Sequence, residues 1–496
     1  MARLDRFSIA LVYGGIGVPV VAALFGAFGF VPAAAFVLAI VAMAAVMPFA
    51  LRPLRALAPF STAARIAFLA IGVVAIARVT GTAVFMLDAS KPGFSAMFYD
   101  PFYFHHNCFS AWWHAARLAA NGTPNVYRNE LYEGWIGRFK LDEFNYPAPT
   151  LLIPGALLLF TKNFFTMRAA WFAIEAALFI AAYLAVAFHV DGEERRRLLW
   201  LAPAVLAATP ILLTLQIGNF QLAALALAML AMVAFDRNRN AAGGAALAFA
   251  ALKIFPGILV FLLILQRRWR AVAWTAAFGA IWLVLTVAAF GPAPVKDFVQ
   301  YQAPRIGSGE PWAFLELPEL QEFNSINQGI PGLVLKARSL TTVVNPRPLM
   351  HRVANVYALL LAALAVLCSF RMNDATPLTR AQIWLGLLAL AALQSPFVPD
   401  AYALTASIWL WALVMPRLCS EASRGASRVA FGVALYFVLS LVMPNDGALF
   451  FPGLARFFVT AAVQLVAIAV AGYAVLQRAP KSAVALVPAT IQETAS

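Results

Sequence analysis

The chain has 496 residues, of which 63% are hydrophobic and only 12% are charged. A soluble domain cannot bury that much apolar surface in its core, so the composition excludes an ordinary soluble protein and indicates one that spans a membrane. The net charge of +14 does not predict a nucleic-acid partner, because the basic residues lie in short segments between apolar runs, as in cytoplasmic loops.

Apolar runs follow one another along most of the chain and predict an all-α polytopic membrane protein. A spanning helix needs about 20 apolar residues, and helices satisfy their own backbone hydrogen bonds in lipid. Two weaker runs are 149–161 and 241–265, the second interrupted at 253–257. With these, we expect about 11–14 membrane helices. The stronger runs are 8–29, 31–50, 66–87, 165–190, 198–216, 219–235, 271–290, 352–370, 381–396, 402–416, 428–443 and 455–476.

The basic segments predict which side of the membrane each loop faces, because Lys and Arg are enriched in cytoplasmic loops. Arg52 and Arg55 mark one inside loop, and 267–270 marks another. The segments 88–147 and 291–350 are then both outside. We therefore expect one transmembrane domain over 1–480, with these two segments as its long outer loops carrying short amphipathic helices, and a short cytoplasmic tail over 481–496.

The middle of the chain needs two irregular segments. The charged segments 193–197 and 236–239 both have the composition of cytoplasmic loops. Both charged segments can lie on the cytoplasmic side only if 149–161 merely dips into the membrane and 241–265 is a pair of half-helices. Discontinuous helices of this kind are tolerated where they line a polar cavity.

The first outer loop is rich in aromatic residues and contains three of the five histidines. Its segment 110–120 is predicted to be an amphipathic helix lying along the membrane surface. His105, His106 and His114 lack a zinc-binding spacing, and the three cysteines form no CxxC pair, so no metal site is expected. Asp100 could act as a general base, although a solvated loop acid is the alternative.

Lys253 lies within an apolar segment, where a charge is costly and typically functional. Pro256 and Gly257 follow, so the helix is predicted to break there. A lysine beside backbone N–H groups freed by such a break suits a phosphate. The alternative is a lysine that reaches the membrane surface from an ordinary helix end. The polar turn 216–219 could likewise be functional or a plain hairpin turn.

Several motifs, in this order, resemble those of glycosyltransferase family 87. They begin with an F-S-A-W-W-H stretch, followed by F-N-Y-P-A-P, Q-I-G-N, an A-G…K-I-F-P…R-R-W-R segment, N-Q-G-I-P-G-L and S-P…D-A-Y. These motifs lie at 109–122, 144–152, 216–219, 242–270, 327–333 and 395–402. Members of the family are membrane enzymes of the GT-C architecture that use polyprenyl-phosphate sugars.

The resemblance implies a GT-C-like fold and an enzyme without a cofactor. It implies transfer of a mannose-like or arabinose-like sugar from a polyprenyl-phosphate donor to a glycan or glycolipid acceptor, by inverting displacement. The enzyme would lie among membrane lipids in a bacterial inner (plasma) membrane, with its active site on the periplasmic or extracellular side. A transporter or flippase of lipid-linked sugars, or a non-catalytic relative, is the alternative.

The resemblance also implies roles for individual residues. The family has an acid just before the aromatic stretch, whereas this chain has Asn107 and Cys108 there, so Asp100 is the expected base. Asp142 and Glu143 are the reserve candidates. The donor phosphate is expected to be bound by Lys253, Arg305 and Lys336. The expected substrate-binding residues are His105, His106, Asn107, Trp112, Tyr146, Gln216, Asn219, Asn327, Gln328 and Asp400.

Overall fold

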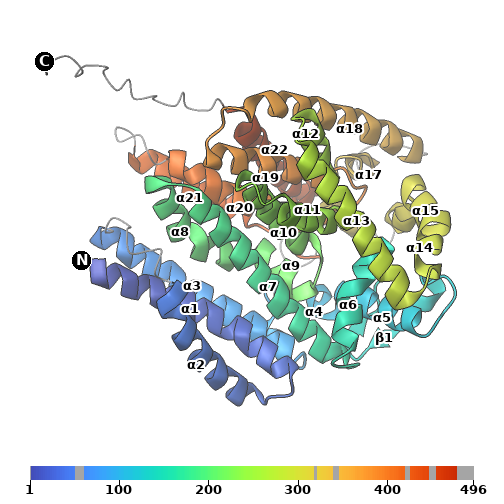
Figure 1. Cartoon of the computed structure of the whole chain (residues 1–496), viewed down its shortest axis with the longest axis horizontal. Helices are drawn as coiled ribbons and strands as arrows, with labels where there is room; N and C mark the ends of the chain where they lie inside the picture. Colours follow the sequence, from blue (N-terminus) through green and yellow to red (C-terminus); the bar gives the residue numbers. More distant parts are fainter. Residues whose placement is uncertain are drawn as a thin grey trace, which may run out of the picture.

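The computed structural model describes residues 2–50, 61–317, 321–338, 346–418, 425–445 and 454–477. These residues form an almost entirely helical protein (Figure 1), which confirms the predicted all-α fold class. One two-stranded antiparallel hairpin, β1 (Trp135–Ile136) and β2 (Phe139–Lys140), is the sheet of the described part of the chain. The predicted cytoplasmic tail, the basic pair Arg52 and Arg55, and Cys419 lie outside the described residues.

Six helices in the described ranges are long and apolar enough to cross a membrane. This is fewer than the expected 11–14, because several apolar runs form shorter helices or are broken by Pro and Gly. The six are α1 (Ala2–Ala27), α3 (Thr62–Leu87), α7 (Phe164–His189), α13 (Trp269–Phe290), α18 (Pro346–Arg371) and α22 (Leu454–Leu476). The other long segments are α2 (Pro32–Ala50), α10 (Gln221–Asp236), α19 (Pro377–Ala392), α20 (Asp400–Leu418) and α21 (Gly425–Leu439).

Two expected runs are broken helices. The run 198–216 forms α8 (Gly192–Ala207) and α9 (Thr209–Ile217), which meet at an angle of 57° around the extended residue Ala208. The run 241–265 forms α11 (Asn240–Ala250) and α12 (Gly257–Leu265), separated by a 3-10 turn, as predicted. The run 149–161 gives only a 3-10 turn and the short α6 (Leu152–Leu158), as expected for a segment that does not cross.

The predicted amphipathic helix of the first outer loop is α5 (Phe109–Ala120). Its expected position on the membrane surface is wrong, because most of its side chains are buried inside the protein. Trp112 and Phe109 join an aromatic cluster with Trp171 of α7 and Phe220 at the start of α10. The apolar face of α5 is covered by neighbouring helices and not by lipid. The other helices of this loop are α4 (Pro101–His105) and the 3-10 turns Pro92–Phe94 and Asn129–Tyr132.

The two segments predicted to be outer loops pack against each other. The Gln302 side-chain amide donates to Asn145 Oδ1 at 2.6 Å, and Arg305 donates to Asn129 Oδ1 at 3.2 Å. Both segments therefore lie on one face of the protein, and Figure 1 shows α14 (Ala293–Asp297) and α15 (Ala303–Ser308) on the same side of the molecule as α5 and β1. The second loop contains α14 (Ala293–Asp297), a π-turn (Phe298–Gln302), α15 (Ala303–Ser308), a 3-10 segment (Glu310–Glu316), α16 (Gln321–Ile326) and α17 (Leu333–Arg338).

Candidate functional site

The break between α11 and α12 places Lys253 at a strained turn. The next residue, Ile254, has φ 73° and ψ −60°, and the Phe255 N–H donates to Lys253 O at 3.0 Å. This is a γ-turn with a β-branched residue at its centre, a conformation that is rare and costs roughly 1–3 kcal/mol. Backbone strain of this kind is typically found where function requires it.

The ammonium group of Lys253 is held by two neutral side chains. It donates to the Tyr146 hydroxyl at 2.9 Å and to Asn219 Oδ1 at 3.1 Å, and it lies 4.5 Å from the Tyr146 ring centre. No carboxylate in the described ranges forms an ion pair with it. Since an ammonium has three N–H donors and Lys253 is only half-buried, one donor is available to an anionic ligand.

Asn219 is positioned by the turn between α9 and α10. Gly218 ends α9 in the left-handed conformation, with φ 67°. A Cβ on this glycine would lie 2.9 Å from Phe109 Cβ and 3.1 Å from the Trp171 ring, so α5 and α7 both require glycine here. The Asn219 amide then links two groups, because it also donates to Cys108 Sγ at 3.4 Å.

Cys108 connects Asn219 to a further set of polar side chains. Its sulfur lies 3.0 Å from the Tyr402 hydroxyl and 3.4 Å from His106 Nε2. His106 Nε2 in turn lies 4.0 Å from Asp142 Oδ2. We call this connected set of seven side chains the Lys253 site. Its members are Lys253, Tyr146, Asn219, Cys108, Tyr402, His106 and Asp142.

Burial sets the protonation of two members of this site. It raises the pKa of the Cys108 thiol to about 12, so the group is a neutral thiol near pH 7. It also lowers the pKa of His106, an effect that the nearby carboxylate of Asp142 partly opposes. Asp142 itself keeps 37% of its side chain exposed, so a molecule can reach it from the surface of the protein.

Asp100, the expected base, lies elsewhere and is fully buried. Its Oδ1 accepts from the Phe102 N–H at 3.0 Å, as the N-cap of α4, and its Oδ2 accepts from the Asn445 N–H at 2.6 Å. Asp400 is buried in the same way, accepting from Ala401 N–H at 2.8 Å and from Met443 N–H at 2.7 Å. Both carboxylates hold the segment 443–445, and this geometry argues against a catalytic role for Asp100.

Two predicted substrate-binding residues connect the first outer loop to α9. Gln216 accepts from the Ala96 N–H at 2.7 Å and donates to Ser95 Oγ and to Tyr103 O, at 3.0 and 2.9 Å. Asn107 donates to Gln216 O at 3.1 Å. Gln216 and Asn107 are both buried, so in this structure they fix the first loop to α9 close to the Lys253 site.

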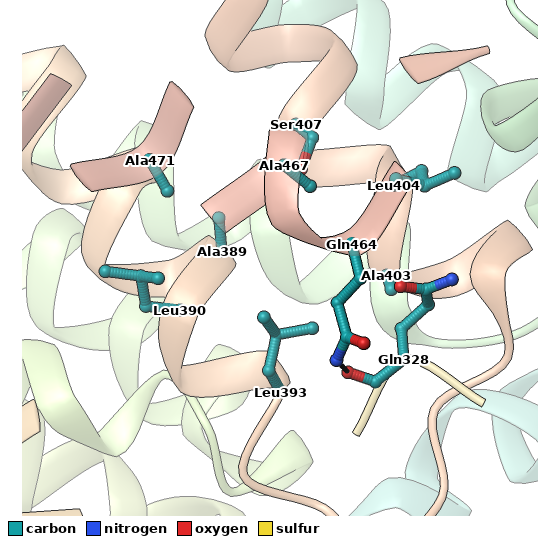
Figure 2. A pocket seen from close by; sticks show the side chains of 10 residues that line it. All are labelled: Gln328, Ala389, Leu390, Leu393, Ala403, Leu404, Ser407, Gln464, Ala467 and Ala471. Carbon is teal, nitrogen blue, oxygen red and sulfur yellow. Dashed lines mark hydrogen bonds between the residues drawn. The ribbon is translucent and has the colours of Figure 1, made fainter. Parts of the chain in front are cut away.

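Asn327 and Gln328 join the second predicted outer loop to the connection between α19 and α20 and to α22. Asn327 Nδ2 donates to Pro396 O at 2.8 Å, and its Oδ1 accepts from two backbone amides. Gln328 lines a small cavity between α19, α20 and α22, where Gln464 Nε2 donates to the backbone carbonyl of Gln328 at 2.6 Å (Figure 2). The cavity is about the size of one water molecule, so it cannot hold a sugar.

The remaining predicted residues also have contacts of their own. Trp112 is buried and packs its ring edge-to-face on Tyr146, with ring centres 5.1 Å apart. It therefore helps to fix the position of the Tyr146 ring in the Lys253 site. His105 binds Arg138 O at 2.9 Å. Arg305 pairs with Glu310 at 2.7 Å. Lys336 is buried in α17, and burial lowers its pKa to about 8, against the opposing charge of Asp400.

Sequence reasoning missed Cys108 and Tyr402 as members of the site and ranked Asp142 behind Asp100. A signal existed for Cys108, because the family resemblance leads one to expect an acid at its position. Asp142 had no such signal, since the β1–β2 hairpin brings it beside His106 through the backbone bridge between His106 and Lys140.

The family model of glycosyltransferase family 87 matches residues 144–396. The matched range contains Tyr146, Asn219 and Lys253, whereas His106, Cys108 and Asp142 precede it. No curated protein and no solved structure matches the chain.

Proposed function

The chain belongs to glycosyltransferase family 87, and from this premise we propose that the Lys253 site transfers a sugar from a polyprenyl-phosphate donor to an acceptor at the outer face of the membrane. Membership makes the protein a membrane glycosyltransferase. The donor, the acceptor and the side of the membrane are the proposal. We further propose that the sugar is mannose-like or arabinose-like, that the acceptor is a glycan or glycolipid, and that the membrane is a bacterial inner membrane.

The observation that carries this proposal is the environment of Lys253. A lysine charge in an apolar segment is costly unless it is compensated. Here its two hydrogen-bond partners, Tyr146 and Asn219, are both neutral. A donor phosphate would supply the missing negative charge through a charge-assisted hydrogen bond. The strained turn at Ile254 holds the lysine at this position.

The acceptor requires a base, and Asp142 is the carboxylate best placed to serve. It lies within 4.8 Å of the Cys108 sulfur and of His106, so its carboxylate occupies the space beside the position where the family has an acid. It is partly exposed, whereas Asp100 is fully buried. A positioned carboxylate contributes roughly 10²- to 10⁴-fold to proton transfer from a hydroxyl.

The proposed reaction is a single displacement. The acceptor hydroxyl gives its proton to Asp142, and its oxygen forms a bond to the anomeric carbon. The bond from that carbon to the phosphate oxygen breaks on the opposite side, which inverts the anomeric centre. The electron pair leaves with the phosphate, whose developing charge Lys253 stabilises.

The test is transfer by the purified full-length chain in proteoliposomes. A polyprenyl-phosphate mannose and a polyprenyl-phosphate arabinose are each supplied with a glycolipid acceptor, and product is followed by mass spectrometry. We expect turnover with one of them, and direct binding of polyprenyl phosphate that Lys253→Met weakens. Equal binding by the wild type and Lys253→Met, with no turnover of either donor, would contradict the proposal.

A further inference from the structure

Three different metal-binding groups converge within the Lys253 site. An imidazole nitrogen of His106, the sulfur of Cys108 and a carboxylate oxygen of Asp142 all lie within 4.8 Å of one another. We propose that these three side chains bind a single Zn²⁺ ion. The inference goes beyond the proposed transfer reaction, because metal binding is a property of the protein without either substrate.

The distances are close to those of a zinc site. Zinc bonds of about 2.3 Å to sulfur and about 2.0–2.2 Å to nitrogen and oxygen place tetrahedral ligand atoms roughly 3.3–3.6 Å apart. The separation of 3.4 Å between Cys108 Sγ and His106 Nε2 already falls in this range. The carboxylate of Asp142 must move by about 1 Å to complete the site, because its Oδ2 lies 4.0 Å from His106 Nε2 and within 4.8 Å of the Cys108 sulfur. A partly exposed side chain that follows β2 can make this shift.

The protein holds two of the three ligands firmly before any ion binds. His106 and Cys108 flank Asn107, which is fully buried and donates a hydrogen bond to the carbonyl of Gln216 in α9. The His106 ring stacks on Phe102, with ring centres 4.8 Å apart. The backbone bridge from His106 to Lys140 brings the third ligand, two residues later, to the same place. Such preorganisation reduces the entropy lost when the ion orders its ligands.

The chemistry of the three groups selects the ion. A thiolate and an imidazole favour zinc over magnesium or calcium, which prefer oxygen ligands. Binding would displace the thiol proton of Cys108 to solvent, because the metal ligand is the thiolate. Three protein ligands leave a fourth position open, as in zinc sites that bind a reacting molecule.

An ion at this place would act on the acceptor. A hydroxyl bound at the open position becomes more acidic, because the cation stabilises the alkoxide. One oxygen of Asp142 would bind the ion, and the other would remain to take the proton. The ion would thereby compensate for the acid that Asn107 and Cys108 replace.

Zinc content of the purified full-length chain is the direct test. The protein is stripped with a chelator, dialysed against a small excess of Zn²⁺ and analysed by mass spectrometry of the metal. We expect about one ion per chain in the wild type and in Cys368→Ser, whose buried thiol on α18 serves as the matched control. Cys108→Ser and His106→Gln should each lower zinc affinity by at least tenfold, in line with the loss of one ligand.

Cobalt substitution tests for a sulfur ligand in the wild type, so this part of the test does not depend on the folding of a variant. Co²⁺ bound to Cys108 should give a thiolate charge-transfer band that Cys368→Ser retains. A wild-type chain that binds no stoichiometric zinc, or cobalt without this band, overturns the proposal. These measurements need no sugar donor, so a failure to bind zinc and a failure to transfer sugar are separate results.

Discussion

Replacing each of two aspartates with asparagine separates a catalytic carboxylate from a structural one. Asp142 faces the Lys253 site and is partly exposed, whereas Asp100 is buried with both oxygens bound to backbone amides. Asp142→Asn should therefore lower turnover without changing stability. Asp100→Asn should lower stability.

The contacts of the two residues give the magnitudes. Asparagine has one side-chain acceptor, so at position 100 it can satisfy either Phe102 N–H or Asn445 N–H and must turn its NH₂ group toward the other. Leaving one buried backbone donor without an acceptor costs about 1–3 kcal/mol. At position 142 the carboxylate accepts one backbone hydrogen bond, from the Glu143 N–H at 3.1 Å. The side-chain oxygen of asparagine can accept the same bond. Loss of the base should instead reduce kcat by roughly 10²- to 10⁴-fold.

Two assays on the same preparations measure these effects. Initial rates of transfer in proteoliposomes give kcat, and thermal unfolding in detergent gives Tm. Glu143→Gln serves as the neighbouring control, because Glu143 is half-buried and its pKa is raised by that burial. We expect Glu143→Gln to retain most of its kcat.

The opposite pattern would refute the reasoning. If Asp100→Asn kept the wild-type Tm and lost turnover, while Asp142→Asn turned over normally, the base would be Asp100 after all. In that case the buried carboxylate would have to become accessible when substrates bind.

Three further predictions test the site and the topology. Lys253→Met should raise KM for the donor by about 10- to 100-fold, since a hydrogen bond to a charged group contributes about 1.5–3 kcal/mol, whereas Lys296→Met on the exposed side of α14 should not. Gln216→Glu should lower Tm by a few degrees, because its second oxygen would face the carbonyl of Tyr103 in place of a donor. Cysteines at Ser90 and Ser308, one in each outer loop, should react with an impermeant maleimide on intact cells.

Each of these expectations has a result that contradicts it. An unchanged donor KM in Lys253→Met removes the phosphate role. A Gln216→Glu protein that unfolds at the wild-type temperature shows that the loop is not held through α9. If Ser90→Cys reacts only after the cells are permeabilised, while Asn373→Cys in the loop between α18 and α19 reacts before, the assigned orientation is inverted.

The sequence by itself determined the class of the protein and the position of most helices. Apolar composition and period are local properties, and a helix in lipid satisfies its hydrogen bonds within its own segment. The runs 66–87, 165–190 and 455–476 therefore became α3, α7 and α22 with ends shifted by only a few residues. The break at Lys253 was equally local, because Pro256 lacks the N–H that a continuing helix would use and its ring disfavours a helical turn before it.

Only the tertiary structure decided which polar side chains meet. The sequence ranked Asp100 first because it lies near the aromatic stretch, but folding turned that carboxylate inward, where it binds backbone amides from a segment more than 300 residues away. Burial and hydrogen-bond partners are long-range properties that no local pattern contains. The same folding brought Asp142, Cys108, Tyr402 and Lys253 together from four separate parts of the chain.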